Sequence, residues 1–171
     1  MEYLLHLDRE IFLYLNNLGT PTWDWFWIFI TNKWSSIPLY AFLIFLLYKK
    51  IGLRTTILAL VLIAGMITCT DQLANVFKDG FMRLRPCNLD LDARFLMDYC
   101  GGYGFFSAHA CSSMALAIFV GSILKRYFKY AMPGMLFWSF LLGYSRIYVG
   151  KHYPGDVVVG FMIGAIIGTL F

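Results

Sequence analysis

Charged residues are scarce in this sequence. Asp, Glu, Lys and Arg make up only 14% of the 171 residues, whereas 60% are hydrophobic. Soluble domains average about 25% charged residues, so the composition predicts an integral membrane protein. The net charge of +4 does not indicate a nucleic-acid partner, because the basic residues form short clusters between apolar runs instead of lining one face.

The sequence also lacks internal repeats and low-complexity linkers, and its start carries Glu2 in place of a basic segment before a long apolar core. We therefore expect one integral membrane domain over residues 1–171, and no cleaved signal peptide. Within it, residues 1–33 are predicted to form interfacial helices and residues 34–171 the transmembrane core.

Long apolar runs, by contrast, are abundant. A helix needs about 17 to 25 residues to cross roughly 30 Å of hydrocarbon. The expected fold class is therefore all-α, a polytopic membrane helical bundle of about five spans. The five runs are 34–48, 55–77, 108–124, 131–148 and 155–171.

The first 33 residues show a different pattern. Residues 2–18 have apolar side chains at helical spacing opposite a charged side, which predicts an amphipathic helix lying on the membrane interface. The following segment, PTWDWFWIFITNKW, is rich in tryptophan but too short to span, so we expect a short re-entrant or interfacial belt helix. The apolar positions of the first helix are Leu4, Leu7, Ile11, Leu15 and Leu18, and the charged ones are Asp8, Arg9 and Glu10.

Two loops contain basic residues and no acidic ones, namely residues 49–54 and 125–129. Short loops rich in Lys and Arg remain on the cytoplasmic side. Alternation of the spans then places residues 78–107, the turn at 149–154 and the N-terminal helix together on the opposite side. The basic residues of the two loops are Lys49, Lys50, Arg54, Lys125, Arg126 and Lys129.

Three polar segments lie on that opposite side, each at a predicted span boundary. They are KDGFMRLRP, FFSAHA and SRIYVGKHYPGD. Charges in or beside a bilayer are costly, which makes each one a candidate functional residue. The candidates are Lys78, Arg85, Ser107, His109, Arg146, His152 and Asp156.

These residue types together suit phosphate chemistry. Arginine and lysine bind phosphate oxygens, and the helix N-terminus beyond Ser107 adds amide donors. Two histidines allow one to attack phosphorus and the other to protonate the leaving oxygen, while Asp156 could fix the tautomer of the attacking imidazole. Taken singly, Lys78 and Arg85 would be snorkelling side chains, Ser107 an N-cap and His109 an interface histidine, so the joint spacing carries this interpretation.

The spacing K-x6-R-P, then Ser and His at a helix start, then S-R-x5-H-x3-D resembles the three motifs of the type 2 phosphatidic acid phosphatase superfamily, which also includes vanadium haloperoxidases. The resemblance covers about residues 35–171. Family members usually carry P-S-G-H in the second motif, where this chain has Phe106, Ser107, Ala108 and His109. Alanine keeps the backbone amide, so activity is expected to persist while the altered loop changes substrate preference.

The resemblance implies a metal-independent hydrolase that acts on lipid phosphate monoesters or diphosphates and needs no cofactor or metal. His152 would form a phosphohistidine, His109 would be the acid and Asp156 would orient His152. The groups implied to bind the phosphate are Lys78, Arg85, Ser107, Ala108 and Arg146.

Several substrates and two other functions stay open. Candidate lipids are undecaprenyl diphosphate, phosphatidylglycerophosphate, phosphatidate and the lipid A phosphates. The alternatives are a lipid phosphotransferase and a non-catalytic lipid-anion transporter or binding protein. The expected partners are the lipid substrate and the bilayer, with no obligatory protein partner evident. The expected location is the cell (inner) membrane, multi-pass, with the site facing the periplasm or exterior.

The remaining predictions concern residues around the motifs. Asp71 is on nearly the same helix face as Lys78, and it and Ser145 are expected to support the site from a second layer. Arg83 and Lys151 are expected to be exposed charges at the mouth of the site. Cys87 and Cys100 bracket the outer loop, where an oxidising compartment would permit a disulfide.

Overall fold

The computed structural model describes residues 2–171, which form six α-helices and one 3-10 helix without any strand longer than an isolated bridge. The predicted all-α class is confirmed. By length and hydropathy alone, one described helix, α3, is long and apolar enough to cross a membrane, and α4 and α6 are shorter apolar helices. The helices are α1 (Glu2–Asn17), α2 (Pro21–Thr31), α3 (Ile37–Phe81), η1 (Pro86–Asn88), α4 (Ala108–Leu124), α5 (Ala131–Tyr148) and α6 (Pro154–Leu170).

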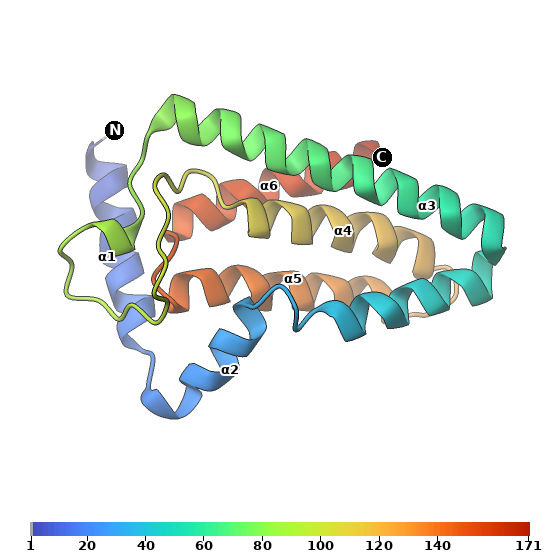
Figure 1. Ribbon diagram of the computed structural model, residues 1–171, viewed down its shortest axis with the longest axis horizontal. Coiled ribbons are helices and arrows are strands. Elements are labelled where there is room, and N and C mark those ends of the chain that lie inside the picture. The colour runs from blue at the N-terminus through green and yellow to red at the C-terminus, as the bar shows by residue number, and fades with distance from the viewer. Residues whose placement is uncertain (1) are drawn as a thin grey trace.

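Helix α3 reverses its direction at Gly52. This residue has φ 77° and ψ 168°, a backbone conformation that glycine adopts far more readily than other residues. The chain therefore forms a hairpin, in which the longer second half runs back along the bundle toward the end where α3 began (Figure 1). The two halves correspond to the predicted apolar runs 34–48 and 55–77.

Helices α4, α5 and α6 lie side by side, and the closest approach is between α4 and α6. Gly160, Gly164 and Gly168 make this approach possible, because a methyl group at any of them would overlap a backbone carbonyl of α4 or of the residue just before it. Small residues at four-residue spacing commonly bring membrane helices together in this way. The contact places the first turn of α6 beside the start of α4, where the backbone N–H of Ser107 donates to the carbonyl of Asp156 at 3.0 Å.

Helix α1 crosses the end of the bundle instead of running along it (Figure 1). Its buried residues are Phe12 and Asn16. The Asn16 side-chain amide donates to the carbonyls of Ile147 and Tyr148 at 3.1 and 2.8 Å, which anchors α1 to the end of α5. The apolar positions predicted to meet lipid are exposed or half-buried: Leu4, Leu7, Ile11, Leu15 and Leu18.

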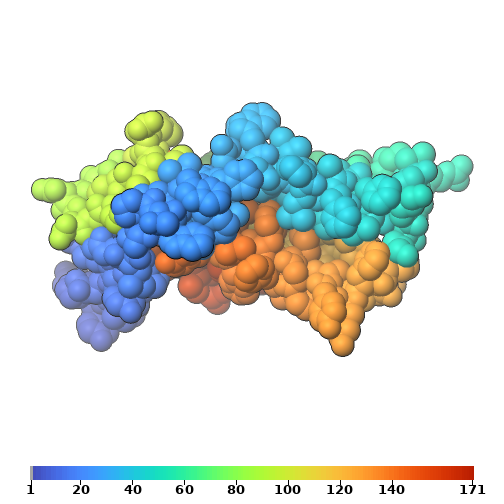
Figure 2. All heavy atoms as spheres, turned by 90° about the horizontal axis from the view of Figure 1, so that it is seen from below, coloured from blue at the N-terminus to red at the C-terminus, as the bar shows by residue number. Residues whose placement is uncertain are grey.

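Helix α2 is the short tryptophan-rich helix that the sequence indicated. It packs against α5 through Trp27, whose ring centre lies 4.8 Å from the ring centre of Tyr144 and 5.3 Å from that of Tyr148. In Figure 2, α2 covers part of α5 beside the loop that precedes α4. The last residue of α2, Thr31, is thereby brought to the side of the polar cluster described next.

Candidate active site

A polar cavity of about 440 Å³ lies where α3 ends and α4 and α6 begin. It is lined from four separate parts of the chain: the end of α3, the loop after it, the start of α4, and the end of α5 with the turn that follows. The structure therefore brings most of the predicted site residues together. Those that line the cavity are Lys78, Arg85, Ala108, His109, Arg146 and His152.

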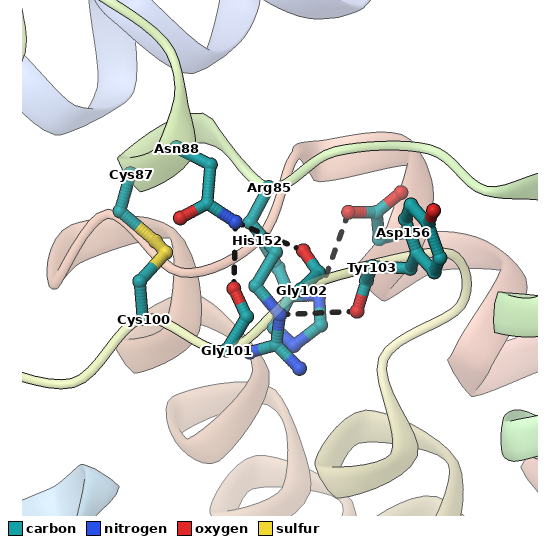
Figure 3. The surroundings of a disulfide bond; sticks show 9 residues. All are labelled: Arg85, Cys87, Asn88, Cys100, Gly101, Gly102, Tyr103, His152 and Asp156. Atoms are coloured by element: carbon teal, nitrogen blue, oxygen red, sulfur yellow. Dashed lines mark hydrogen bonds and ion pairs between the residues drawn. A yellow bond between two sulfur atoms is a disulfide. The ribbon is translucent and has the colours of Figure 1, made fainter.

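His152 lies in the tight turn between α5 and α6 and is 2% exposed. Pro154 begins α6 directly after this turn, so Asp156 follows His152 by about one helical turn. Its carboxylate Oδ2 lies 3.4 Å from His152 Nδ1 and also accepts from the backbone N–H of Tyr153 at 3.0 Å (Figure 3). Among the described residues Nδ1 has no hydrogen-bond partner of good geometry, which suits a contact that tightens when substrate binds.

The surroundings of His152 favour its neutral form. Burial lowers the pKa of the imidazole well below its usual value, and the guanidinium groups of Arg146 and Arg85 lower it further. A neutral imidazole keeps one ring nitrogen with a free lone pair. Because Asp156 lies on the Nδ1 side, that nitrogen is Nε2, which is then free to act as a nucleophile.

Arg85 is positioned by the loop between α3 and α4. Its Nε donates to the carbonyl of Tyr103 at 3.1 Å, which leaves the terminal N–H groups to bind an anion. Cys87 and Cys100 are joined in a disulfide with a Cα–Cα distance of 5.9 Å, as the sequence led us to expect. Figure 3 shows this bond next to Arg85 and His152, so the crosslink constrains the loop segment that carries Arg85.

Arg146 is the most deeply buried cation of the site, at 5% exposed. Its Nη1 donates to the hydroxyl of Thr31 at 2.7 Å, and its Nε has no partner among the described residues. A buried charged donor without a partner is costly. A phosphate oxygen in the cavity would satisfy it.

Ser107 has the structural role that its position at a helix start also indicated. It is the N-cap of α4, and its Oγ accepts from the backbone N–H of Ala110 at 3.4 Å. The cavity is lined by Ala108 and His109, the next two residues, instead of by Ser107. The hydroxyl proton of Ser107 is still available as a donor, so its predicted phosphate contact stays a prediction.

The two residues expected in a supporting layer differ in their position. Asp71 lines the cavity together with Lys78, whose Nζ donates to Asn75 Oδ1 at 3.5 Å. Ser145 is fully buried, and its hydroxyl donates to the carbonyl of Leu142 within α5 at 2.7 Å. Asp71 can therefore act on the site directly, whereas Ser145 contributes through the end of α5.

The expectation that Arg83 is an exposed charge is wrong. Its Nη1 donates to Asp156 Oδ1 at 2.9 Å and its Nη2 to Asp8 Oδ2 at 2.7 Å, and its guanidinium lies 4.1 Å from the centre of the Tyr153 ring. Asp8 also accepts from the backbone N–H of Gly155 at 2.7 Å. Helix α1 is thus connected through Arg83 to the carboxylate that faces His152.

The expectation that Lys151 is an exposed charge is also wrong. It is half-buried and lines the cavity. Burial lowers the pKa of its ammonium group, and Arg146 and Arg85 lower it further. The site therefore contains a fourth cationic side chain beyond the three in the motifs.

Comparison with known proteins gives matches over most of the chain. A model of the PAP2 superfamily matches residues 54–171. Lipid A 4′-phosphatase from Bacteroides thetaiotaomicron is 34% identical over 177 aligned residues, covering 100% of this chain and 78% of that protein. The Porphyromonas gingivalis protein of the same name is 34% identical, covering 98% and 72%.

Solved structures show the same fold. The crystal structure of Aquifex aeolicus LpxE superposes with a TM-score of 0.77 at 27% identity, covering 96% of this chain and 93% of the other. A transmembrane PAP2-type phosphatidylglycerolphosphate phosphatase from Bacillus subtilis gives a TM-score of 0.79 at 19% identity, covering 99% and 85%. The second likeness is evidence for the fold alone.

Proposed function

Because this chain belongs to the PAP2 superfamily, we propose that it hydrolyses a lipid phosphate through a phosphohistidine formed on His152. The observation that carries this proposal is a buried imidazole that lines a cavity rich in cations, with a carboxylate beside it. The resemblance stated from the three motifs is confirmed by the family match, and so is the reaction class, a lipid phosphatase.

In the first step, Nε2 of His152 attacks the phosphorus atom and the bond from phosphorus to the leaving oxygen breaks. The negative charge of the bound phosphate favours the imidazolium form of His109, which gives its proton to that oxygen and becomes neutral. Asp156 stabilises the positive charge that His152 acquires. Arg85, Arg146 and Lys78 neutralise the charge on the other phosphate oxygens in the transition state.

In the second step, neutral His109 removes a proton from a water molecule whose oxygen attacks the phosphorus. The bond between phosphorus and nitrogen breaks, and its electron pair returns to His152. The products are inorganic phosphate and the dephosphorylated lipid, and both histidines recover their initial protonation states. The cationic side chains supply the positive charge that a divalent metal would otherwise supply, so the proposed mechanism needs no metal ion.

Among the candidate lipids, a lipid A phosphate has the most support. Two relatives that match nearly the whole chain at 34% identity are named lipid A 4′-phosphatases. An undecaprenyl-diphosphatase of Sulfolobus acidocaldarius covers 99% of this chain but at only 28% identity, and BcrC of Bacillus subtilis matches only 44% of it. We therefore rank the phosphate on a lipid A-type head group first.

The membrane arrangement that we propose has five spans: the two halves of α3, then α4, α5 and α6. Residues 1–33 would lie on the interface, and residues 34–171 would form the transmembrane core. The acid-free basic loops at 49–54 and 125–129 support a cytoplasmic position for the opposite end of the bundle. The active site would then face the periplasm or exterior.

Phosphate release from purified lipid phosphates in detergent tests the mechanism. We expect His152→Ala to abolish turnover, and His109→Ala to accumulate an acid-labile, base-stable phosphoenzyme. Activity of the wild-type protein should persist in a chelator. Near-normal phosphate release by His152→Ala would rule out the proposed nucleophile.

Orientation can be tested with an impermeant maleimide on intact cells. Single cysteines are introduced at Lys50, Asp98 or Lys129, all exposed, and the parent chain without an added cysteine is the control. Labelling at Asp98 alone is expected. Labelling at Lys50 and Lys129 but not at Asp98 would place the active site on the cytoplasmic side.

A further inference from the structure

One carboxylate of α1 reaches the turn between α5 and α6. Of the three consecutive charged residues in this helix, Arg9 and Glu10 are exposed, whereas the side chain of Asp8 is only 14% exposed. Helix α1 lies outside residues 54–171, which the PAP2 model matches, and Asp8 does not line the active-site cavity. An effect of Asp8 on the reaction would therefore pass through the residues that it contacts.

The first contact of Asp8 is with the start of α6. Its Oδ1 accepts from the backbone N–H of Gly155 at 2.7 Å, and N–H groups in the first turn of a helix have no partner within that helix. A carboxylate at this end of a helix is also stabilised by the helix dipole. Glycine leaves room for the contact, because a methyl group at position 155 would lie 2.7 Å from Asp8 Oδ2, too close for two unbonded atoms. Helix α1 therefore holds the first turn of α6.

The second contact of Asp8 is with Arg83. Asp8 Oδ2 accepts from Arg83 Nη2 at 2.7 Å, and Arg83 Nη1 donates to Asp156 Oδ1 at 2.9 Å. The other oxygen of Asp156, Oδ2, is the one that lies 3.4 Å from His152 Nδ1. Two carboxylates thus bind different N–H groups of one planar guanidinium, which fixes its orientation. The same guanidinium holds one oxygen of Asp156, and this sets the direction of the other oxygen toward His152.

Tyr153, the residue after His152, provides a third connection to α1. It is buried, and its ring centre lies 5.4 Å from that of Phe12 in an edge-to-face arrangement. The guanidinium of Arg83 lies 4.1 Å from the centre of the same ring. Two of the three residues that separate His152 from Asp156 are therefore in contact with α1.

We propose that Asp8 is a positioning residue for the reaction, because it holds Asp156, through Arg83, in the orientation that supports His152. The inference rests on the proposed roles of His152 and Asp156 and adds to them a requirement for α1. In the proposed mechanism Asp156 stabilises the positive charge that His152 acquires as it attacks. This charge is larger in the transition state than in the bound substrate, so a loss of alignment lowers kcat and leaves KM nearly unchanged.

Asp8→Asn tests this role, because it keeps the size of the side chain and removes its charge. The amide oxygen can still accept from the N–H of Gly155, but the side chain no longer binds the Arg83 guanidinium as a carboxylate does. We expect kcat for phosphate release from purified lipid phosphates in detergent to fall about fivefold, with KM nearly unchanged. Glu10→Gln is the matched control, because it removes the same charge from an exposed position of the same helix. It should leave kcat unchanged.

Two further variants separate positioning from a general loss of stability. Because Asp8 acts on Asp156 through Arg83, the effects of Asp8→Asn and Arg83→Gln should not multiply, and the double variant should lose about as much kcat as Arg83→Gln alone. Gly155→Ala keeps every charge and raises helix propensity, but its methyl group displaces the Asp8 carboxylate. It should therefore lower kcat without lowering the thermal unfolding midpoint.

Wild-type kcat in either Asp8→Asn or Gly155→Ala would overturn the positioning role. Effects of Asp8→Asn and Arg83→Gln that multiply in the double variant would overturn it as well, and so would an equal fall of kcat in Glu10→Gln. An absence of phosphate release by the wild-type protein from every lipid phosphate would instead refute the proposed phosphatase function.

Discussion

Basic side chains gather at both ends of the helical bundle, but the two ends hold them differently. At the end around Gly52 and residues 125–129, Lys50 lies over the rings of Phe128 and Tyr127 at 5.2 and 5.8 Å, and Lys129 lies over Tyr130 at 5.4 Å. At the active-site end, Arg83 pairs with Asp8 and Asp156, and Arg94 pairs with Asp24. Within residues 2–171, every ion pair of the structure is at the active-site end.

The difference separates two uses of the same residue types. Exposed lysines over aromatic rings keep their ammonium groups in contact with water. They orient the chain in the membrane through their charge, without a defined hydrogen-bond geometry. Arginines paired with carboxylates hold neighbouring groups in fixed positions. A buried arginine with an unpaired N–H group, such as Nε of Arg146, can donate that group to a bound anion.

The largest effect that tests this comparison is removal of one cation from each end. Arg85→Gln should lower kcat/KM by about 10³, because the loss of one donor that stabilises developing charge typically costs 10² to 10³. Lys50→Gln removes the same charge from the other end and should leave kcat/KM unchanged. Phosphate release by the two purified variants, at equal folded protein, is the measurement. A similar loss in both would mean that the basic residues act only through net charge.

A smaller effect is expected at Arg83, which touches the orienting carboxylate but does not line the cavity. Arg83→Gln should lower kcat by about tenfold with little change in KM, since it acts on the transition state through the position of Asp156. Arg94→Gln is the matched control, because it breaks an ion pair at the same end that involves Asp24 instead. An equal fall in kcat for both variants would show that the loss of any ion pair at this end suffices.

The sequence predicted those parts of the site whose geometry is local. The bounds of α4 and α5 coincide with the predicted runs 108–124 and 131–148, and a motif placed at a helix end puts its side chain at that end of the bundle. His152 and Asp156 are separated by one turn and meet for that reason alone. Spacing along the chain was therefore enough to predict that these two side chains meet.

Partners from distant parts of the chain could not be found in this way. Arg83 contacts Asp8 across 75 residues, and Arg146 contacts Thr31 across 115. Neither pair has a periodic pattern, and both depend on where α1 and α2 pack against the bundle. An arginine two residues before a motif arginine therefore resembled an exposed charge until the position of α1 was known.

The smallest predicted effect concerns the protonation of His152 at the active-site end. A histidine in the unfolded chain titrates near about pH 6.5, whereas burial and the nearby guanidinium groups lower the pKa of His152 in the folded protein. Between pH 7.5 and 5.5 the unfolded chain therefore takes up more protons at this position than the folded protein does. The contribution of His152 to the free energy of unfolding is full well above pH 6.5 and falls by up to about 1 kcal/mol between pH 6.5 and 5.5. NMR of histidine-labelled protein, with His152→Gln to assign the resonance, should show a neutral imidazole down to pH 5.5, and the same variant should lose less stability than the wild type over this range. A titration midpoint at pH 6.5 or above would contradict the lowered pKa of His152 and remove this reason for a neutral imidazole at the site.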